Sequence, residues 1–381
     1  MGKRVMTAIV GLLAVTAVAA QQPPGPGYAP LFNGRDFTGW DITPDRGAWA
    51  AEAGEMRCMG KPGTPYLIRT VKEYENFEFT AEFNVSKNCN TGIFFHVFDG
   101  CGRESRIGFE AQILDDAGMP PNRTSTGSIY DVVAPKENAM KPAGEWNLYR
   151  VLFDWPRCRI WLNDRLVQDE DFSANPILKY RMRTGVIGLS NHGFPVAYRN
   201  LWIKELPDME RWTDLYHGRD LAGWKTVGNA DWKIEEGLLV ATGGDGWLVS
   251  EREFEKFHFQ AIVDNDTLQA HGGCFSYRFR SPEAPGYSAD FYDYPEAVRL
   301  TAQYGKNIPE TVIPPWKYPM LLYQIISADR ESEVRVGGYI TAKNTLLGKA
   351  RPGHIAIHHT PEDGDLRIRM LRIKDLEGKG L

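Results

Sequence analysis

Residues 31–40 read Leu31-Phe32-Asn33-Gly34-Arg35-Asp36-Phe37-Thr38-Gly39-Trp40, and a related stretch, Leu215-Tyr216-His217-Gly218-Arg219-Asp220-Leu221-Ala222-Gly223-Trp224, follows in the second half of the chain. The two stretches share their glycines, their arginine, their aspartate and their final tryptophan. Self-similarity at so long a period indicates a duplicated domain rather than a solenoid of short repeats.

Further matching segments occur in the same order in both halves. They pair Tyr74–Phe79 with Phe254–Phe259, Gly108-Phe109 with Gly286-Tyr287, Trp161–Val167 with Arg335–Thr341, and Leu201–Leu206 with Leu371–Leu376. We therefore predict two tandem domains after a linker at residues 21–29. Copy one is residues 30–206 and copy two is residues 207–381, with the break near Pro207.

Within copy one, short apolar runs alternate with turn residues. Phe77–Val85 places apolar and polar side chains on alternate faces, and Thr91–Phe98 is almost continuously apolar. Asn147–Asp154 and Arg159–Gln168 are expected to form a hairpin, and Val186–Leu189 and Ala197–Leu206 to close the unit. With 38 glycines and 24 prolines in the chain, this pattern predicts an all-β fold of two-sheet sandwiches or jelly rolls.

The first twenty residues resemble a secretory signal peptide. Lys3 and Arg4 precede an apolar run that ends in the small residues of Ala17–Ala20, as expected for export with cleavage near Gln21. An uncleaved anchor is the alternative, but the run is short for a membrane span. The expected location is therefore secreted or periplasmic, in a bacterium, with no membrane contact after cleavage.

The charge and the cysteine content narrow the possible partners, disulfides and metal sites. The net charge is −5 and the basic residues are scattered, so we expect no nucleic-acid partner. An oxidising compartment permits disulfides, and among the five cysteines Cys89 and Cys101 are the favoured pair. No Cys-x-x-Cys motif occurs, so a structural zinc site is not expected.

The stretch Gly108–Asp116 is the most informative for function. Its alternation places Glu110 and Gln112 on one face of a strand and Phe109 and Ala111 on the other. A carboxylate and a carboxamide that point the same way suggest a cleft, although a plain solvent-facing strand has the same pattern.

Several motifs together resemble the 3-keto-disaccharide hydrolase domain family. They are Leu-Phe-Asn-Gly-x-Asp-x-x-Gly-Trp from Leu31, Gly-Phe-Glu-x-Gln from Gly108, Gly144–Asn147, a Trp-Leu-Asn strand and a closing Ile-Gly-Leu-x-x-His-Gly. The resemblance covers residues 30–206 and continues, weakened, through 212–377. It implies concanavalin-like jelly-roll domains and a carbohydrate substrate, a glycoside whose sugar is oxidised at C3.

The resemblance also implies a set of polar site residues. Carried onto this chain, the family's polar positions fall on Glu110, Gln112, Tyr130, Lys141 and His192. We expect Glu110 and His192 to be catalytic, and we expect the substrate to be bound by Gln112, His96, Tyr130, Lys141, Asn191 and Asp115. Asn191 stands where the family usually has Asp, which weakens an Asp–His pairing. His96 stands where the family often has Arg.

Copy two lacks this set. Alignment on Gly286-Tyr287 places Ser288 opposite Glu110 and Asp290 opposite Gln112, and Thr360 falls opposite His192. We therefore expect the site in copy one. A cluster of Asp290, Asp293 and His358 would instead indicate an independent site in copy two.

A ketone at C3 acidifies the hydrogen on C2, so Glu110 could remove it and the glycosidic oxygen could then leave. His192, Lys141 or Tyr130 could protonate that oxygen or stabilise the enolate. A divalent metal on Glu110 and His192 would polarise the ketone, but two ligands do not define a site. No cofactor is otherwise indicated.

Two alternatives stay open. A conventional glycosidase would use Glu110 and Asp115 as its carboxylate pair, and it needs a bulge in the strand to bring them to one face. A non-catalytic carbohydrate-binding protein would use exposed aromatic rings. We expect Trp40, Trp146 and Trp224 to pack in the core instead.

Overall fold

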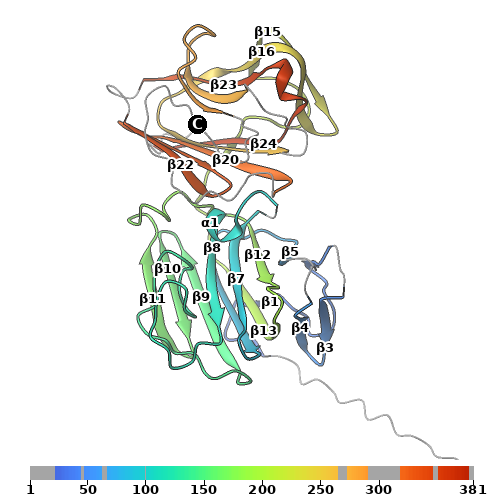
Figure 1. Cartoon of the computed structure of the whole chain (residues 1–381), viewed down its shortest axis with the longest axis vertical. Coiled ribbons are helices and arrows are strands. Elements are labelled where there is room, and N and C mark those ends of the chain that lie inside the picture. Colours follow the sequence, from blue (N-terminus) through green and yellow to red (C-terminus); the bar gives the residue numbers. More distant parts are fainter. Residues whose placement is uncertain are drawn as a thin grey trace, which may run out of the picture.

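The computed structural model describes residues 22–43, 47–61, 67–98, 100–264, 273–290, 318–345 and 351–376 (Figure 1). The expected signal peptide and Asp293 lie outside these residues. Among the helices described, none is long and apolar enough to cross a membrane. The predicted all-β fold class is confirmed.

Copy one is a sandwich of two antiparallel sheets. The large sheet has the order β11-β10-β9-β6-β13-β4-β3, with β1 on β13, and the small sheet has the order β2-β5-β12-β7-β8. The elements are β1 (Ala29–Pro30), β2 (Trp40–Asp41), β3 (Trp49–Glu52), β4 (Glu55–Met59), β5 (Leu67–Thr70), β6 (Phe77–Val85), β7 (Asn90–Val97), α1 (Glu104–Ile107), β8 (Phe109–Leu114), β9 (Asn147–Asp154), β10 (Arg157–Leu162), β11 (Arg165–Asp171), β12 (Val186–Ser190) and β13 (Pro195–Glu205).

Alternation of side chains determines what each sheet encloses. On β6 the five apolar residues from Phe77 to Val85 are buried in the core between the sheets, while Glu78 and Glu82 point outward. On β8, Phe109, Ala111 and Ile113 enter the same core. Glu110 and Gln112 therefore lie on the outer face of the small sheet.

One strand expected from the sequence is two strands in the structure. Residues 157–171 form β10 and β11, which pair around a turn at Asn163 and Asp164. Both turn residues have positive φ, 49° and 65°, the backbone that a two-residue hairpin turn requires and that Asn and Asp tolerate. The predicted single strand Arg159–Gln168 was therefore wrong.

Copy two repeats the sandwich, with its strands joined into one eleven-stranded sheet among the described residues. The path is β19-β18-β23-β16-β24-β17-β20-β21-β22, with β14 on β24 and β15 on β16. The elements are β14 (Thr213–Asp214), β15 (Trp224–Glu235), β16 (Leu238–Phe254), β17 (Phe257–Asp264), β18 (Cys274–Phe279), β19 (Tyr287–Asp290), β20 (Met320–Ser327), β21 (Glu331–Val336), β22 (Tyr339–Thr345), β23 (Gly353–His359), η2 (Pro361–Asp363) and β24 (Leu366–Asp375).

The long strand β16 explains why the two layers are connected. Its first residues pair with β24, as β4 pairs with β13 in copy one, and its later residues pair with β23, as β5 pairs with β12. What is two strands in copy one is thus continuous in copy two, and it links one layer to the other.

The repeated stretch has the same role in both copies. The indole Nε1 of Trp40 donates to the carbonyl of Leu31 at 2.7 Å, and Nε1 of Trp224 donates to the carbonyl of Leu215 at 2.7 Å. Trp40 is buried and Trp224 packs against the core of copy two, so both have the predicted core role.

The expected disulfide is absent. Cys89 and Cys101 are both buried and outside any disulfide, as are the other three cysteines. Cys89 directly precedes β7 and Cys101 follows it, and eight residues of β-strand span about 26 Å. The two sulfurs therefore lie near opposite ends of the sandwich, far beyond disulfide reach.

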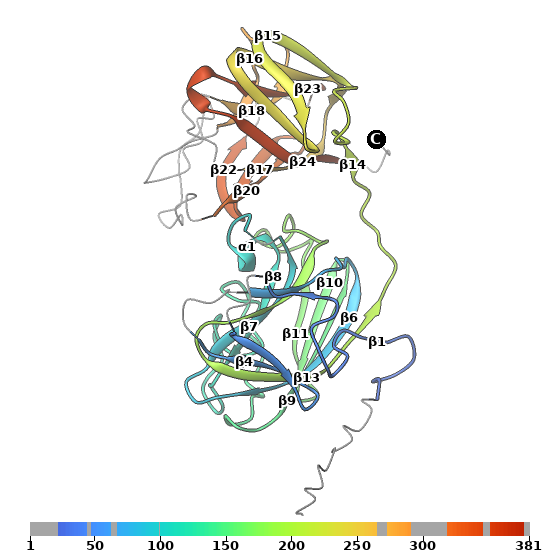
Figure 2. The same cartoon turned by 90° about the vertical axis from the view of Figure 1, so that its right-hand side faces the viewer.

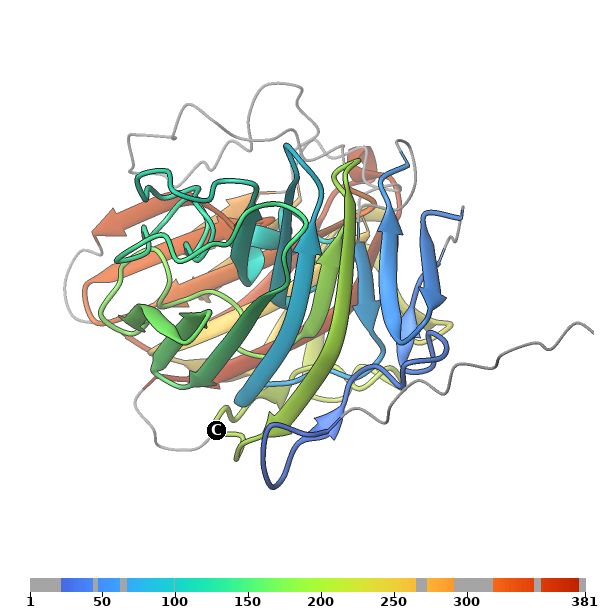
Figure 3. The ribbon, with the colours of Figure 1, turned by 90° about the horizontal axis from the view of Figure 1, so that it is seen from below.

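The two copies pack against each other through the top of copy one (Figures 1 and 2). Cys101, Ile107 and Met182 of copy one form an apolar cluster with Ile262 and Leu322 of copy two. Seen from below, the strands of copy two cross behind those of copy one (Figure 3). Polar contacts between the copies join Gln324 Nε2 to the carbonyl of Tyr180 at 3.0 Å and Arg335 Nη1 to the carbonyl of Ile177 at 3.1 Å.

Candidate active site

Glu110 lies on the outer face of the small sheet and is only 4% exposed. It is paired with Phe94 across β7 and β8, and its side chain lies over Gly92 on the neighbouring strand. A Cβ atom at position 92 would come within 2.3 Å of Glu110 Oε1. The absence of a side chain at Gly92 therefore leaves the space that the Glu110 carboxyl group occupies.

Burial controls the ionisation of this carboxyl group. Loss of hydration raises the pKa of Glu110 to about 8, while the positive charge of Arg103 lowers it and the negative charge of Glu104 raises it. The Glu110 carboxyl group is therefore buried, its pKa lies near neutral pH, and it is available for a proton transfer.

Gln112 extends the same face and is held from several sides. Its Nε2 donates to Asn90 Oδ1 at 3.0 Å, and its backbone carbonyl accepts from the Tyr149 hydroxyl at 2.5 Å. Its Oε1 is buried with no hydrogen-bond partner among the described residues. A buried acceptor without a donor is costly, so this oxygen is suited to a substrate hydroxyl.

Tyr130 is brought to the site by its backbone, because its N–H donates to the carbonyl of Glu110 at 3.0 Å. The guanidinium of Arg103 lies 5.8 Å from the centre of the Tyr130 ring. Sequence reasoning missed Arg103. Its position in a short Gly-Arg-Glu segment before α1 has no signal of its own, and it reaches Glu110 only through the fold.

His192 lies further along the sheet. Glu110, Phe94 and Gly188 share one rung across β8, β7 and β12, whereas His192 follows four residues beyond Gly188. Asn191 and His192 thus lie beyond the end of β12, off the rung that holds Glu110. Asn191 is buried, with its Oδ1 accepting from the Gly193 N–H at 3.0 Å. Burial lowers the pKa of His192, which favours the neutral imidazole.

The structure removes His96 from the expected substrate site. Its backbone has φ of 56°, which turns the side chain from the outer face into the core. The ring packs edge-on against Phe77, Phe109 and Phe153, and its Nε2 pairs with the carbonyl of Glu75 at 2.8 Å. Burial lowers the pKa of His96 to about 4. His96 is thus a neutral core residue.

Lys141 and Asp115 are also held away from Glu110. Lys141 Nζ donates to the carbonyl of Trp146 at 3.0 Å in the loop before β9. Asp115 Oδ2 accepts from the Asn88 N–H at 2.9 Å, beyond the other end of β8. The pairing of β7 with β8 has no bulge, so about 16 Å of strand separates Glu110 from Asp115. A retaining carboxylate pair needs about 5 Å, so the Glu110–Asp115 glycosidase alternative is wrong.

No cluster of three or more His, Cys, Asp or Glu side chains suited to a metal occurs in the described part of the chain. The separation of Glu110 from His192 along the sheet also argues against a shared ion.

In copy two the matching face is built differently. Strand pairing places Cys274 where copy one has Gly92, Ser288 where it has Glu110, and His358 where it has Ser190. The ring of His358 stacks on Trp247, with centroids 4.0 Å apart and planes at 13°. Trp247 is itself buried, so the face that is polar in copy one is covered by an indole in copy two.

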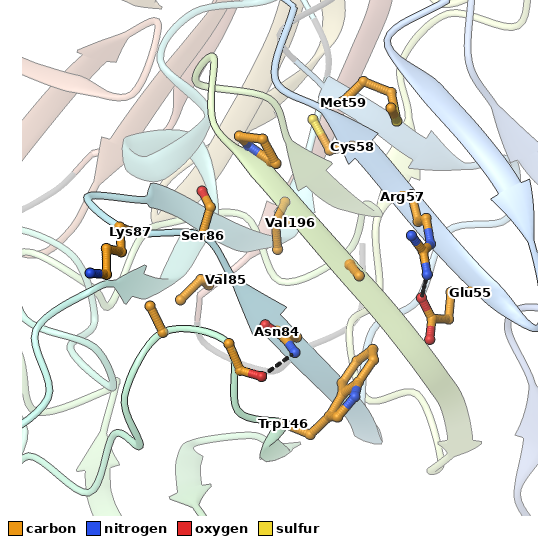
Figure 4. A pocket seen from close by; sticks show the side chains of 14 residues that line it. Glu55, Arg57, Cys58, Met59, Asn84, Val85, Ser86, Lys87, Trp146 and Val196 are labelled. Carbon is orange, nitrogen blue, oxygen red and sulfur yellow. Dashed lines mark hydrogen bonds and ion pairs between the residues drawn. The ribbon is translucent and has the colours of Figure 1, made fainter.

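Two hollows lie on the opposite side of copy one, over the outer face of the large sheet. One, of about 600 Å³, contains an ion pair between Arg57 and Glu55 and a hydrogen bond from Asn84 to the Gly144 carbonyl (Figure 4). Trp146 lines this hollow, so its predicted core role was wrong. The guanidinium of Arg199 lies 3.9 Å from the centre of its ring, and that contact occupies a face on which a sugar would stack.

A model of the 3-keto-alpha-glucoside-1,2-lyase-like domain matches residues 27–204 and, separately, residues 211–374. The chain belongs to this family. The two matched segments correspond to the two copies, and the resemblance seen in the motifs is confirmed.

One relative and two solved structures are similar to parts of this chain. A 3-keto-disaccharide hydrolase from Bacteroides thetaiotaomicron is 25% identical over 230 residues, which covers 47% of this chain and 79% of that protein. A solved structure of a candidate glycosyl hydrolase from Parabacteroides distasonis is 28% identical, with a TM-score of 0.42, covering 48% of this chain and 95% of that one. A carbohydrate-binding module from Bacillus subtilis is 14% identical, with a TM-score of 0.33, covering 44% of this chain and 94% of that one.

Proposed function

We propose that copy one cleaves glycosides whose sugar is oxidised to a ketone at C3, and that Glu110 is the base that removes the C2 proton. The observation that carries this proposal is the buried carboxyl group over Gly92, with its pKa raised to about 8. A general base is most effective when its pKa lies near the working pH, and an ordinary surface glutamate is far below that range.

The reaction balances as an elimination followed by a hydration. Glu110 takes the C2 hydrogen as a proton. The electron pair of the broken C2–H bond then forms the enolate of the C3 ketone. The C1–oxygen bond then breaks, and the aglycone leaves with that bonding pair and a proton. Water adds across the resulting C1–C2 double bond, which returns a proton to C2 and gives the free 3-keto sugar.

Other residues of the face have defined parts in this proposal. Gln112 Oε1 accepts a hydrogen bond from a sugar hydroxyl. The hydroxyl of Tyr130, whose backbone N–H donates to the carbonyl of Glu110, protonates the leaving oxygen or stabilises the enolate. His192, further along the face, contacts the aglycone end of the substrate. Export of the chain to the periplasm or medium belongs to the same proposal, because oxidised glycosides would be met there.

The test compares a 3-keto-glucoside with its unoxidised parent glycoside in deuterated water. We expect turnover of the keto substrate only, with deuterium incorporated at C2 of the released sugar. A plain glycoside has no acidic C2 hydrogen and should be inert. Hydrolysis of the plain glycoside at a comparable rate, or product without C2 deuterium, would contradict the elimination mechanism.

A further inference from the structure

The turn between β21 and β22 of copy two lies against copy one beside the candidate site. The N–H of Arg103 donates to the carbonyl of Gly337 at 3.0 Å. A Cβ atom at Gly338 would lie 2.7 Å from the backbone carbon of Arg106, and one at Gly102 would lie 2.3 Å from Cα of Gly337. Only glycines permit this backbone-to-backbone contact.

The matching turn in copy one shows that this contact is specific to copy two. Asn163 and Asp164 connect β10 to β11 just as Gly337 and Gly338 connect β21 to β22, and all four residues have positive φ. The turn geometry is therefore conserved between the copies, while the side chains are missing only where the turn docks. The glycines serve the docking, because Asn and Asp suffice for the turn itself.

Copy two also holds the segment that carries Arg103. The N–H of Met320 donates to the carbonyl of Gly100 at 3.1 Å, and the N–H of Leu322 donates to the carbonyl of Cys101 at 2.9 Å. Together with the bond from Arg103 to Gly337, these contacts pair residues 100–103 with β20 and the turn. The backbone of Arg103 is thus positioned by copy two.

Tyr339, the first residue of β22, positions the side chain. It is 8% exposed, and its ring lies 4.8 Å from the guanidinium carbon of Arg106. Its hydroxyl is near enough to act electrostatically on the guanidinium of Arg103, and it has no hydrogen-bond partner among the described residues. Arg103 is therefore enclosed between Tyr339 of copy two and Tyr130 of copy one, next to Glu110.

We propose that copy two is a working part of the copy-one active site: its Gly337–Gly338 turn and Tyr339 hold Arg103 beside Glu110, so that Arg103 and Tyr339 are positioning residues for proton transfer at Glu110. This inference rests on the proposed function for the role of Glu110. It gives the second, diverged copy a function without a site of its own.

The charge balance around Glu110 sets the direction of the expected effect. The groups that act on it are Arg103 and Glu104 from the α1 segment, with Tyr149 on β9 and Tyr198 on β13 beneath the sheet. Arg103 is the one cation among them. Its positive charge favours the carboxylate, so displacing Arg103 raises the pKa of Glu110.

The experiment compares three full-length variants with the wild type. Tyr339→Phe removes the phenol beside Arg103, and Gly338→Asp introduces the residue that copy one has at this turn. Gly243→Asp is the matched control, since Gly243 also has positive φ, 79°, but a Cβ there meets nothing within 4 Å. Two readouts are used: the carboxyl ¹³C titration of Glu110, assigned with Glu110→Gln, and the pH dependence of kcat/KM on a 3-keto-glucoside.

We expect Tyr339→Phe and Gly338→Asp to raise the titration midpoint of Glu110, and with it the acid limb of kcat/KM, by about one pH unit. Gly243→Asp should change neither. An unchanged Glu110 midpoint in folded Tyr339→Phe and Gly338→Asp would overturn the inference. A raised midpoint in an enzyme that does not turn over the keto substrate would support the positioning and overturn the proposed function instead.

Discussion

The outer faces of two equivalent strand groups, β7-β8-β12 in copy one and β18-β19-β23 in copy two, have the same backbone and different side chains. His96 and Arg278 occupy one position and both have positive φ, 56° and 57°. Gly108 and Gly286 pass equally close to the neighbouring strand, within 2.0 and 2.4 Å of a carbonyl oxygen for an added Cβ. Such features are what the fold requires.

The outward side chains follow a different rule. Copy one has Glu110 over a glycine, while copy two has Ser288 and a tryptophan covered by His358. Since the same backbone accepts both sets, folding does not require Glu110. The buried carboxyl group costs stability, and its presence in only one copy indicates a functional reason for that cost.

A large effect on activity is expected at Gly92. Gly92→Ser would place Cβ 2.3 Å from Glu110 Oε1 and force the carboxyl group to move. A displacement of about 1 Å in a reacting group typically costs 10²-fold, so kcat/KM should fall by about that factor. Cys274→Ser introduces the same residue at the equivalent position of copy two and should leave kcat/KM unchanged. Equal losses in both variants would show that the two faces matter equally.

Glu110 should also make stability depend on pH. Its pKa of about 8 in the folded chain exceeds the ordinary value, so the folded state binds the proton more tightly and the free energy of unfolding falls as pH rises toward 8. Between pH 4.5 and 8, Glu110 lowers the free energy of unfolding by no more than about 5 kcal/mol, and Glu110→Gln removes this pH dependence. Denaturant unfolding at pH 5 and pH 9 measures it. A wild-type-to-variant difference that does not change with pH would contradict the raised pKa.

His96 should make the stability of the fold depend on pH in the acid range. Its pKa is lowered to about 4, so the unfolded chain takes up the proton first, and stability present above pH 6.5 is lost as pH falls toward 4. The shift corresponds to about 3 kcal/mol. His96→Asn, which tolerates the positive φ, should unfold with a weaker acid dependence than the wild type. Arg278 has no such titration, so Arg278→Asn should leave the acid dependence as it is.

The smallest effect is expected at His192. If it contacts the aglycone end rather than the reacting carbons, His192→Ala should raise KM by about tenfold and leave kcat nearly intact. Thr360→Ala, at the equivalent position of copy two, should change neither constant. A loss confined to kcat would place His192 in the chemical step.

The sequence predicted those parts of the fold that depend on local alternation. Phe77–Val85 is β6 with the expected faces, and the outward pair Glu110 and Gln112 is where the pattern placed it. The repeat and the loss of Glu110 in copy two were also visible from the sequence.

Features that depend on one backbone angle or on docking were not predictable in this way. Positive φ at His96 reverses the direction that alternation assigns to its side chain. The turn at Asn163 and Asp164 splits a run whose composition suits a single strand. Arg103 and Tyr339 meet only because the two copies pack together, and their separation in sequence leaves no pattern to detect.

The most direct test is turnover of a 3-keto-glucoside by Glu110→Gln beside Ser288→Ala, its counterpart in copy two. Gln keeps the shape of the side chain but cannot accept the C2 proton, so kcat should fall by about 10²–10⁴-fold, with the chain folded and the substrate still bound. Ser288→Ala should match the wild type. Full activity of Glu110→Gln would contradict the assignment of the base, and an equal loss in Ser288→Ala would contradict the division of labour between the copies.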